Sequence, residues 1–72
     1  MKDEPKQMLV VVNGEPRRVA AGTVAELIVE LDLSEVRVAV MVDDAIVRRP
    51  ERARVPIAEG SRIEIISMVG GG

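Results

Sequence analysis

The sequence predicts an α+β fold in which one helix covers one face of a mixed sheet of four or five strands. Two observations lead to this prediction. Short β-branched runs bounded by turn residues lie near both ends and in the middle of the chain. One apolar stripe with helical spacing lies between the second and the third of these runs. A chain of 72 residues has room for one such domain and little more.

The first part of the chain predicts a hairpin followed by the helix. Residues 8–12 are mostly β-branched and stop at Asn13-Gly14, the strongest two-residue hairpin signal, so residues 16–20 form the return strand. Thr23 and Glu26 have the spacing of a capping box, in which the Thr23 hydroxyl accepts from the Glu26 N–H and Glu26 reaches back. The apolar stripe of the helix consists of Val24, Leu27, Ile28 and Leu31.

The second part predicts three more strands. The helix ends between residues 32 and 34, and alternating Val residues make 38–42 a strand. Residues 45–47 form a short strand, residues 48–54 a polar loop around Pro50, and the last strand runs from 62 to about 69. A hairpin, a helix and then further strands are arranged most economically as a β-grasp. We expect the helical stripe to pack on Val10, Val12, Val40, Ile63 and Ile65.

The two ends of the chain differ from the domain at 8–69. Residues 1–7 are charged, contain a proline and predict a flexible lead-in, whereas residues 70–72 predict a mobile tail of three glycines. Glycine has no Cβ, and three extended residues span at most about 10 Å. The tail is therefore thin enough to pass the ionised carboxylate of Gly72 into a narrow opening of another protein. A frayed end without a role is the alternative for the tail taken alone.

Composition excludes several classes of function. The chain has no His and no Cys, so the usual catalytic bases, nucleophiles, transition-metal ligands and disulfides are missing. Ten basic and 12 acidic residues give a net charge of −2, and there are no aromatic residues, which argues against a nucleic-acid binder. No run approaches the roughly 18 apolar residues of a membrane span, and no signal peptide is evident. We expect a cytoplasmic protein.

Two charged clusters have competing interpretations. Asp43-Asp44 is able in principle to share a metal, but a solvated turn is favoured because Asp is a common turn residue. A second cluster is either a dock for an acidic partner or phosphate, or a solvated loop, and the loop is favoured. It consists of Arg48, Arg49, Arg52 and Arg54.

The last strand predicts a partner-binding patch. If Ile63 and Ile65 face the helix, Ile66 and Met68 face away from it, where a one-sided sheet is normally polar. A contiguous exposed apolar patch often marks a partner surface. Cover by a loop or by the lead-in, or a register shifted by one residue, are the alternatives. The predicted patch consists of Val11, Met41, Ile66, Met68 and Val69.

With these features in place, residues 8–72 closely resemble the ThiS-type sulfur carriers of thiamine biosynthesis, members of the ubiquitin-like β-grasp group. Each matching segment is weak alone, but their joint order and spacing are specific. The matching segments are Val12-Asn13-Gly14-Glu15, Ala21-Gly22-Thr23-Val24, Glu26-Leu27, Leu31, Val38-Ala39-Val40, Ala45-Ile46-Val47, Arg49, Glu59-Gly60, Arg62-Ile63-Glu64-Ile65 and Val69-Gly70-Gly71-Gly72. The family's usual Asn-Gly-type turn is Asp43-Asp44 here, and Arg48 and Ser61 replace a common proline and aspartate.

The resemblance implies a carrier, not an enzyme. A ubiquitin-activating-type enzyme would use Mg-ATP to adenylate the carboxylate of Gly72, the only covalently active residue. A sulfur donor would then make a thiocarboxylate, and thiazole synthase would take the sulfur. Gly70 and Gly71 form the tail. We expect the chain itself to bind no cofactor or metal, and no feature of the sequence demands more than a monomer when it is free.

The sequence also allows other functions for such a chain. A molybdopterin-type carrier shares the fold and the tail chemistry, but such chains tend to carry a proline before Gly-Gly, and residues 65–69 contain none. A carrier for tRNA thiolation or cysteine synthesis is a third reading. A protein modifier joined to lysines through Gly72, and an interaction module with an inert tail, come from different classes.

Overall fold

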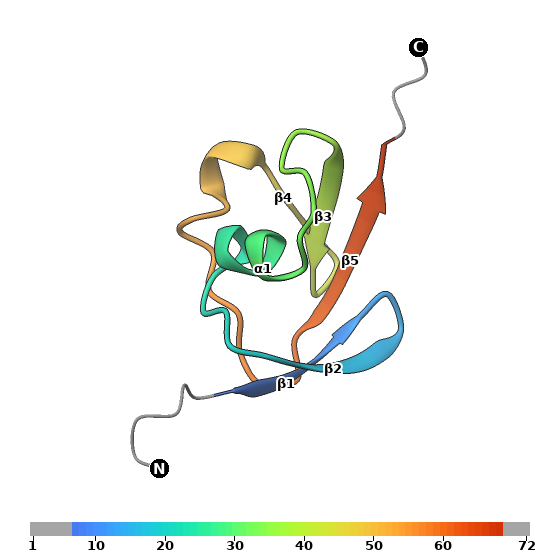
Figure 1. Ribbon diagram of the computed structural model, residues 1–72, viewed down its shortest axis with the longest axis vertical. Coiled ribbons are helices and arrows are strands. Elements are labelled where there is room, and N and C mark those ends of the chain that lie inside the picture. Colours follow the sequence, from blue (N-terminus) through green and yellow to red (C-terminus); the bar gives the residue numbers. More distant parts are fainter. Residues whose placement is uncertain (1–6, 69–72) are drawn as a thin grey trace.

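Five strands form one mixed sheet, and one α-helix lies across a face of it, in the computed structural model, which describes residues 7–68 (Figure 1). The sheet order is β2-β1-β5-β3-β4, so β5 is central; it runs parallel to β1 and antiparallel to β3. The sheet curves around the helix (Figure 1). The elements are β1 (Met8–Val12), β2 (Glu15–Val19), α1 (Val24–Glu30), β3 (Val38–Val42), β4 (Ala45–Val47), the 3₁₀ helix η1 (Arg49–Glu51) and β5 (Arg62–Ser67).

The order of elements predicted from the sequence is confirmed, with differences at the margins. β5 ends at Ser67 and not near residue 69, and residues 48–54 contain η1 where a loop was predicted. The lead-in predicted for 1–7 lies outside the described residues except for Gln7, and the glycine tail at 70–72 lies wholly outside them.

Both hairpins turn through two residues with positive φ. Asn13 and Gly14 have φ of 51° and 84°, and Asp43 and Asp44 have φ of 50° and 73°. Positive φ at both central positions is the geometry of a type I′ turn, whose twist matches that of the flanking strands. Asp43 Oδ1 also accepts from the N–H of Arg62 at 2.9 Å. The acidic pair is therefore a turn, and the preferred interpretation of its sequence is confirmed.

The N-terminus of α1 is capped by side chains, with one difference from the prediction. Thr23 Oγ1 accepts from the Glu26 N–H at 3.2 Å, as the capping box requires. The carboxylate of Glu26 reaches one residue further back than predicted, to the N–H of Gly22 at 2.8 Å. Glu30 Oε1 accepts from the N–H of Ala21 at 2.9 Å, so the helix is also tied to the chain that enters it.

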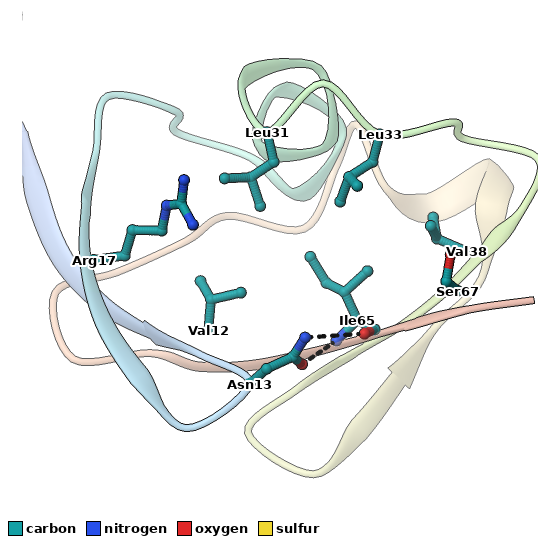
Figure 2. A pocket seen from close by; sticks show the side chains of 8 residues that line it. All are labelled: Val12, Asn13, Arg17, Leu31, Leu33, Val38, Ile65 and Ser67. Atoms are coloured by element: carbon teal, nitrogen blue, oxygen red, sulfur yellow. Dashed lines mark hydrogen bonds between the residues drawn. The ribbon is translucent and has the colours of Figure 1, made fainter.

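The C-terminus of α1 ends in a Schellman motif. Asp32 adopts φ of 60°, its N–H donates to the Val29 carbonyl at 3.0 Å, and the Leu33 N–H donates to the Ile28 carbonyl at 3.0 Å. This turn places Leu33 beside Leu31 above one end of the sheet (Figure 2). Leu33 is 37% exposed and so is not part of the sealed core.

The core lies between α1 and the sheet. Every predicted core residue is buried except Leu31, which is half-buried and packs against the cluster. Leu27 is fully buried at the centre of the helix face. The core cluster consists of Val10, Val12, Val19, Ala21, Val24, Leu27, Ile28, Val38, Val40, Val47, Ile57, Ile63 and Ile65.

The burial of Arg52 contradicts the prediction that all four arginines of residues 48–54 lie in a solvated loop. Its side chain is only 6% exposed, whereas Arg48, Arg49 and Arg54 are exposed as expected. Arg52 Nη1 donates to the Glu35 carbonyl at 2.7 Å and Nη2 to the Val38 carbonyl at 2.8 Å. Burial, and then the charge of Arg49, lower the pKa of Arg52, while Glu35 opposes them. Arg52 thus ties the α1–β3 connection to the segment after β4 and is not available for docking.

Candidate docking face and C-terminal site

The face of the sheet opposite α1 carries most of the residues predicted to bind a partner. Strand alternation points them there, because their neighbours Val10, Val40 and Ile65 are buried against the helix. Ile66 is 56% exposed and Met68 is 50% exposed. Val11 and Met41 are half-buried on the same face.

The strand register brings some of these residues together. Met41 lies directly opposite both Glu64 on β5 and Ile46 on β4, and Ala39 lies opposite Ile66. Side chains directly opposite one another on a face interact, so these strands form one apolar surface with Glu64 inside it. We call it the outer apolar cluster, and it consists of Met41, Ile46, Ile66 and Met68.

Ile46 was missed by the sequence analysis and is the most exposed large apolar residue of the described chain, at 74%. The signal was present: Val47 is the inward residue of a three-residue strand, and the hairpin at Asp43-Asp44 pairs Ile46 with Met41. Assigning a face to β4 from that register would have identified it.

Val11 lies on the same face but outside the outer apolar cluster. It pairs with Arg62, which precedes Ile66 by four residues on β5 and so lies about 13 Å from it along the strand. Arg62 also forms an exposed ion pair with Asp44 at 2.8 Å. Val69, the fifth predicted patch residue, lies outside the described residues.

The predicted covalent site is linked to this face by the chain itself. Gly70, Gly71 and Gly72 lie outside the described residues, but four residues join Met68 to Gly72 and span at most about 14 Å. The predicted site at Gly72 is therefore joined by a short segment to the end of the strand that carries the outer apolar cluster.

Neither a metal site nor a membrane-spanning helix is found among residues 7–68. In that range no group of three or more His, Cys, Asp or Glu side chains is placed to hold a metal ion. None of the helices described there has the length and apolar character needed to cross a membrane.

A five-stranded mixed sheet that curves around one helix, with a parallel pair formed by the first and last strands, defines a ubiquitin-like β-grasp protein. The predicted fold class is thereby confirmed. The ThiS family model matches residues 10–72, and the chain belongs to the ThiS family.

Solved structures agree with this assignment. The crystal structure of the thiamine biosynthesis protein ThiS from Geobacter metallireducens superposes with a TM-score of 0.75 at 28% identity, covering 90% of this chain and 100% of that one. The NMR solution structure of a thiamine biosynthesis protein from the same organism gives a TM-score of 0.74 at 26% identity, covering 90% and 88%.

One curated relative is much longer than this chain. A protein named thiazole synthase from Paramagnetospirillum magneticum is 38% identical over 66 residues, which are 90% of this chain and 20% of that protein. The chain thus spans about a fifth of the length of that relative.

Proposed function

We propose that this chain is a sulfur carrier of thiamine biosynthesis, whose terminal carboxylate at Gly72 is adenylated by a partner enzyme and converted to a thiocarboxylate. The observation that carries the proposal is the match of the ThiS family model, which runs through residue 72 and so includes the three glycines. The structural similarity to the thiamine biosynthesis protein ThiS and to a thiamine biosynthesis protein, both from Geobacter metallireducens, supports the same assignment.

The proposed chemistry needs an activating enzyme because hydroxide is a poor leaving group from a carboxylate. The Gly72 carboxylate attacks the α-phosphorus of ATP, which releases pyrophosphate and leaves an acyl-adenylate. A sulfur nucleophile then attacks the acyl carbon, so a C–S bond forms, a C–O bond breaks and AMP leaves. The activating enzyme holds Mg-ATP. The chain itself, without His or Cys, acts as substrate and carrier and catalyses no step.

We propose thiazole synthase as the protein that takes the sulfur. The support is the similarity between this chain and one fifth of a protein that bears that name, which indicates that a carrier of this kind works together with that activity. The ATP needed for activation is in line with the cytoplasmic location expected from the sequence.

The test is to incubate the chain with its cognate adenylating enzyme, Mg-ATP and sulfide and to measure the intact mass. We expect replacement of one terminal oxygen by sulfur, with no change when ATP or the enzyme is left out. An unmodified chain beside an enzyme that is demonstrably active would show that the chain is not a sulfur carrier.

The outer apolar cluster is proposed to dock on the activating enzyme. Ile66→Asp should then weaken binding by roughly tenfold or more, because a buried isoleucine contributes about 1.5–3 kcal/mol. The fold should persist since Ile66 is 56% exposed. Val36→Asp is the matched control, because Val36 is 58% exposed but lies in the α1–β3 connection. Equal affinities of the two variants by calorimetric titration would remove this cluster from the interface.

A further inference from the structure

β1 leaves the sheet before its neighbour β5 does. Their parallel pairing covers Val11 with Arg62 and Val12 with Ile63, and the Asn13 N–H still donates to the Ile63 carbonyl at 2.8 Å. The chain then turns away through Gly14 into β2. Beyond Ile63, the side of β5 that faced β1 has no strand beside it within residues 7–68.

The side chain of Asn13 replaces one further strand residue. Its Oδ1 accepts from the Ile65 N–H at 2.8 Å, and its Nδ2 donates to the Ile65 carbonyl at 3.1 Å (Figure 2). One amide thus supplies the acceptor and the donor that the backbone of a neighbouring strand would supply. The ladder is extended as far as Ile65 and then stops.

Ser67 is the next residue of β5 with this orientation. It pairs with Val38, and the Met68 N–H donates to the Arg37 carbonyl at 2.6 Å, which is the pattern of a pair that exchanges no hydrogen bonds of its own. The N–H and the carbonyl of Ser67 therefore point away from β3, as those of Ile65 do. No hydrogen bond to either group is found within the described part of the chain.

A groove lies directly above this open edge. It encloses about 290 Å³ between the sheet and the end of α1. Leu31 and Leu33 cover it, Val12 and Ile65 form its floor, and Arg17 of β2 closes one side (Figure 2). Ser67 also lines it. We call this space the β5 groove.

We propose that the β5 groove receives an extended segment of the protein that activates the terminal carboxylate. The segment takes the place that β1 vacates and pairs with the N–H and the carbonyl of Ser67. This inference deepens the proposed function and rests on it. A peptide strand is the occupant because its backbone offers a donor and an acceptor at the spacing that the open edge requires, and because it continues the parallel ladder that β1 begins.

The lining of the β5 groove specifies the side chains of that segment. In a strand, residues i and i+2 point to the same face. One of them is apolar and enters between the leucine cover and the floor of Val12 and Ile65. The other carries a carboxylate and reaches Arg17, which is the charged residue among the described residues that line the groove.

The position of the β5 groove explains why a partner would use it. Ser67 is separated by a single described residue from the segment that leads to Gly72. A strand added there pairs with Ser67, the last residue of β5. It thereby fixes the direction in which the terminal residues leave the domain. The β5 groove lies on the helix side of the sheet, whereas the outer apolar cluster lies on the opposite side.

The backbone pairing is tested by Ser67→Pro. Proline removes the N–H of residue 67, which the fold does not use, and its ring blocks the vacated position. We expect the KM of adenylation to rise about tenfold with little change in kcat, as loss of a hydrogen bond and of close approach predicts. Ser67→Ala, which keeps the N–H, is the matched control and should change the KM by less than about twofold.

The charge on the rim gives a second test that does not depend on how well the proline variant folds. Arg17 and Arg18 are adjacent and exposed, but Arg17 lines the β5 groove and Arg18 lies on the other face of β2, opposite Leu9. Arg17→Glu should raise the KM severalfold, with the effect shrinking as salt is added, and Arg18→Glu should have a much smaller effect. The proposal is overturned if Ser67→Pro has the KM of Ser67→Ala and Arg17→Glu has the KM of Arg18→Glu.

Amide exchange of the wild-type chain separates the possible occupants. In the complex with the activating enzyme, the Ser67 N–H should gain protection, whereas that of Met68, already bonded to the Arg37 carbonyl, should change little. Protection of Ser67 that appears without the enzyme and grows with protein concentration would assign the groove to a second copy and refute the proposal. A wild-type chain that is never adenylated would refute the proposed function; a wild-type chain that is adenylated, with unchanged variants, would refute only the groove.

Discussion

Removal of Gly71 and Gly72 is expected to abolish thiocarboxylate formation while leaving the folded domain unchanged. The shortened chain still ends in a glycine carboxylate, so the reacting group is chemically the same. It ends about 7 Å closer to Met68, because each extended residue spans at most about 3.6 Å. If the domain docks through the outer apolar cluster as proposed, the shortened chain should no longer bring its carboxylate to the α-phosphorus of ATP in the partner.

Intact mass after incubation with the activating enzyme, Mg-ATP and sulfide measures this effect. Deletion of Lys2 and Asp3, which shortens the other end by the same number of residues, is the control and should be loaded as well as the full chain. Gly71→Val should also fail, since its side chain widens the segment that is proposed to pass into the partner. Normal loading of the chain that ends at Gly70 would show that reach does not limit the reaction.

Much of the fold could be predicted from the sequence because its signals are local. The Asn13-Gly14 turn, the Thr23 cap and the stripe around Leu27 each depend on residues within a few positions of one another, and all three are confirmed. The exposed positions of Ile66 and Met68 followed from strand alternation alone.

The errors and omissions concern contacts between distant residues. The sequence shows Arg52 as one of several arginines near Pro50, and nothing in it reveals that the carbonyls of Glu35 and Val38 lie within reach. Asn13 meets Ile65 across a separation of 52 residues, so the open edge at Ser67 becomes visible only in three dimensions.

Ile46 was omitted for a different reason, which concerns the short strand β4 and not a contact between distant residues. A strand of three residues has too short a pattern to assign its faces, so its exposed residue depends on the register with β3. The structure thereby makes the outer apolar cluster wider than predicted, across β4, β3 and β5. A partner that docks there would contact an apolar surface that spans three strands. The segment that leads to Gly72 continues from β5, one of those strands.

Leu27→Ala is expected to cost about 2–5 kcal/mol of unfolding free energy, the largest effect of any single stability change considered for this chain. Leu27 is fully buried where α1 meets the sheet, so truncation removes its contacts and leaves a cavity. No aromatic residue is present in the chain to fill that space. Small domains have only about 5–15 kcal/mol of stability, so the variant loses a large share of it.

Thermal unfolding measures the loss of stability, and in a domain of this size each kcal/mol shifts the Tm by about 4–8 °C. Val29→Ala is the matched control, since Val29 lies on the same helix but is 73% exposed. Its Tm should stay near the wild-type value or rise slightly, because alanine favours the helix more than valine does. The Leu27→Ala variant should also be loaded with sulfur less well as the temperature rises, in step with its unfolding. A Tm for Leu27→Ala equal to that of Val29→Ala would mean that α1 does not pack on the sheet through Leu27.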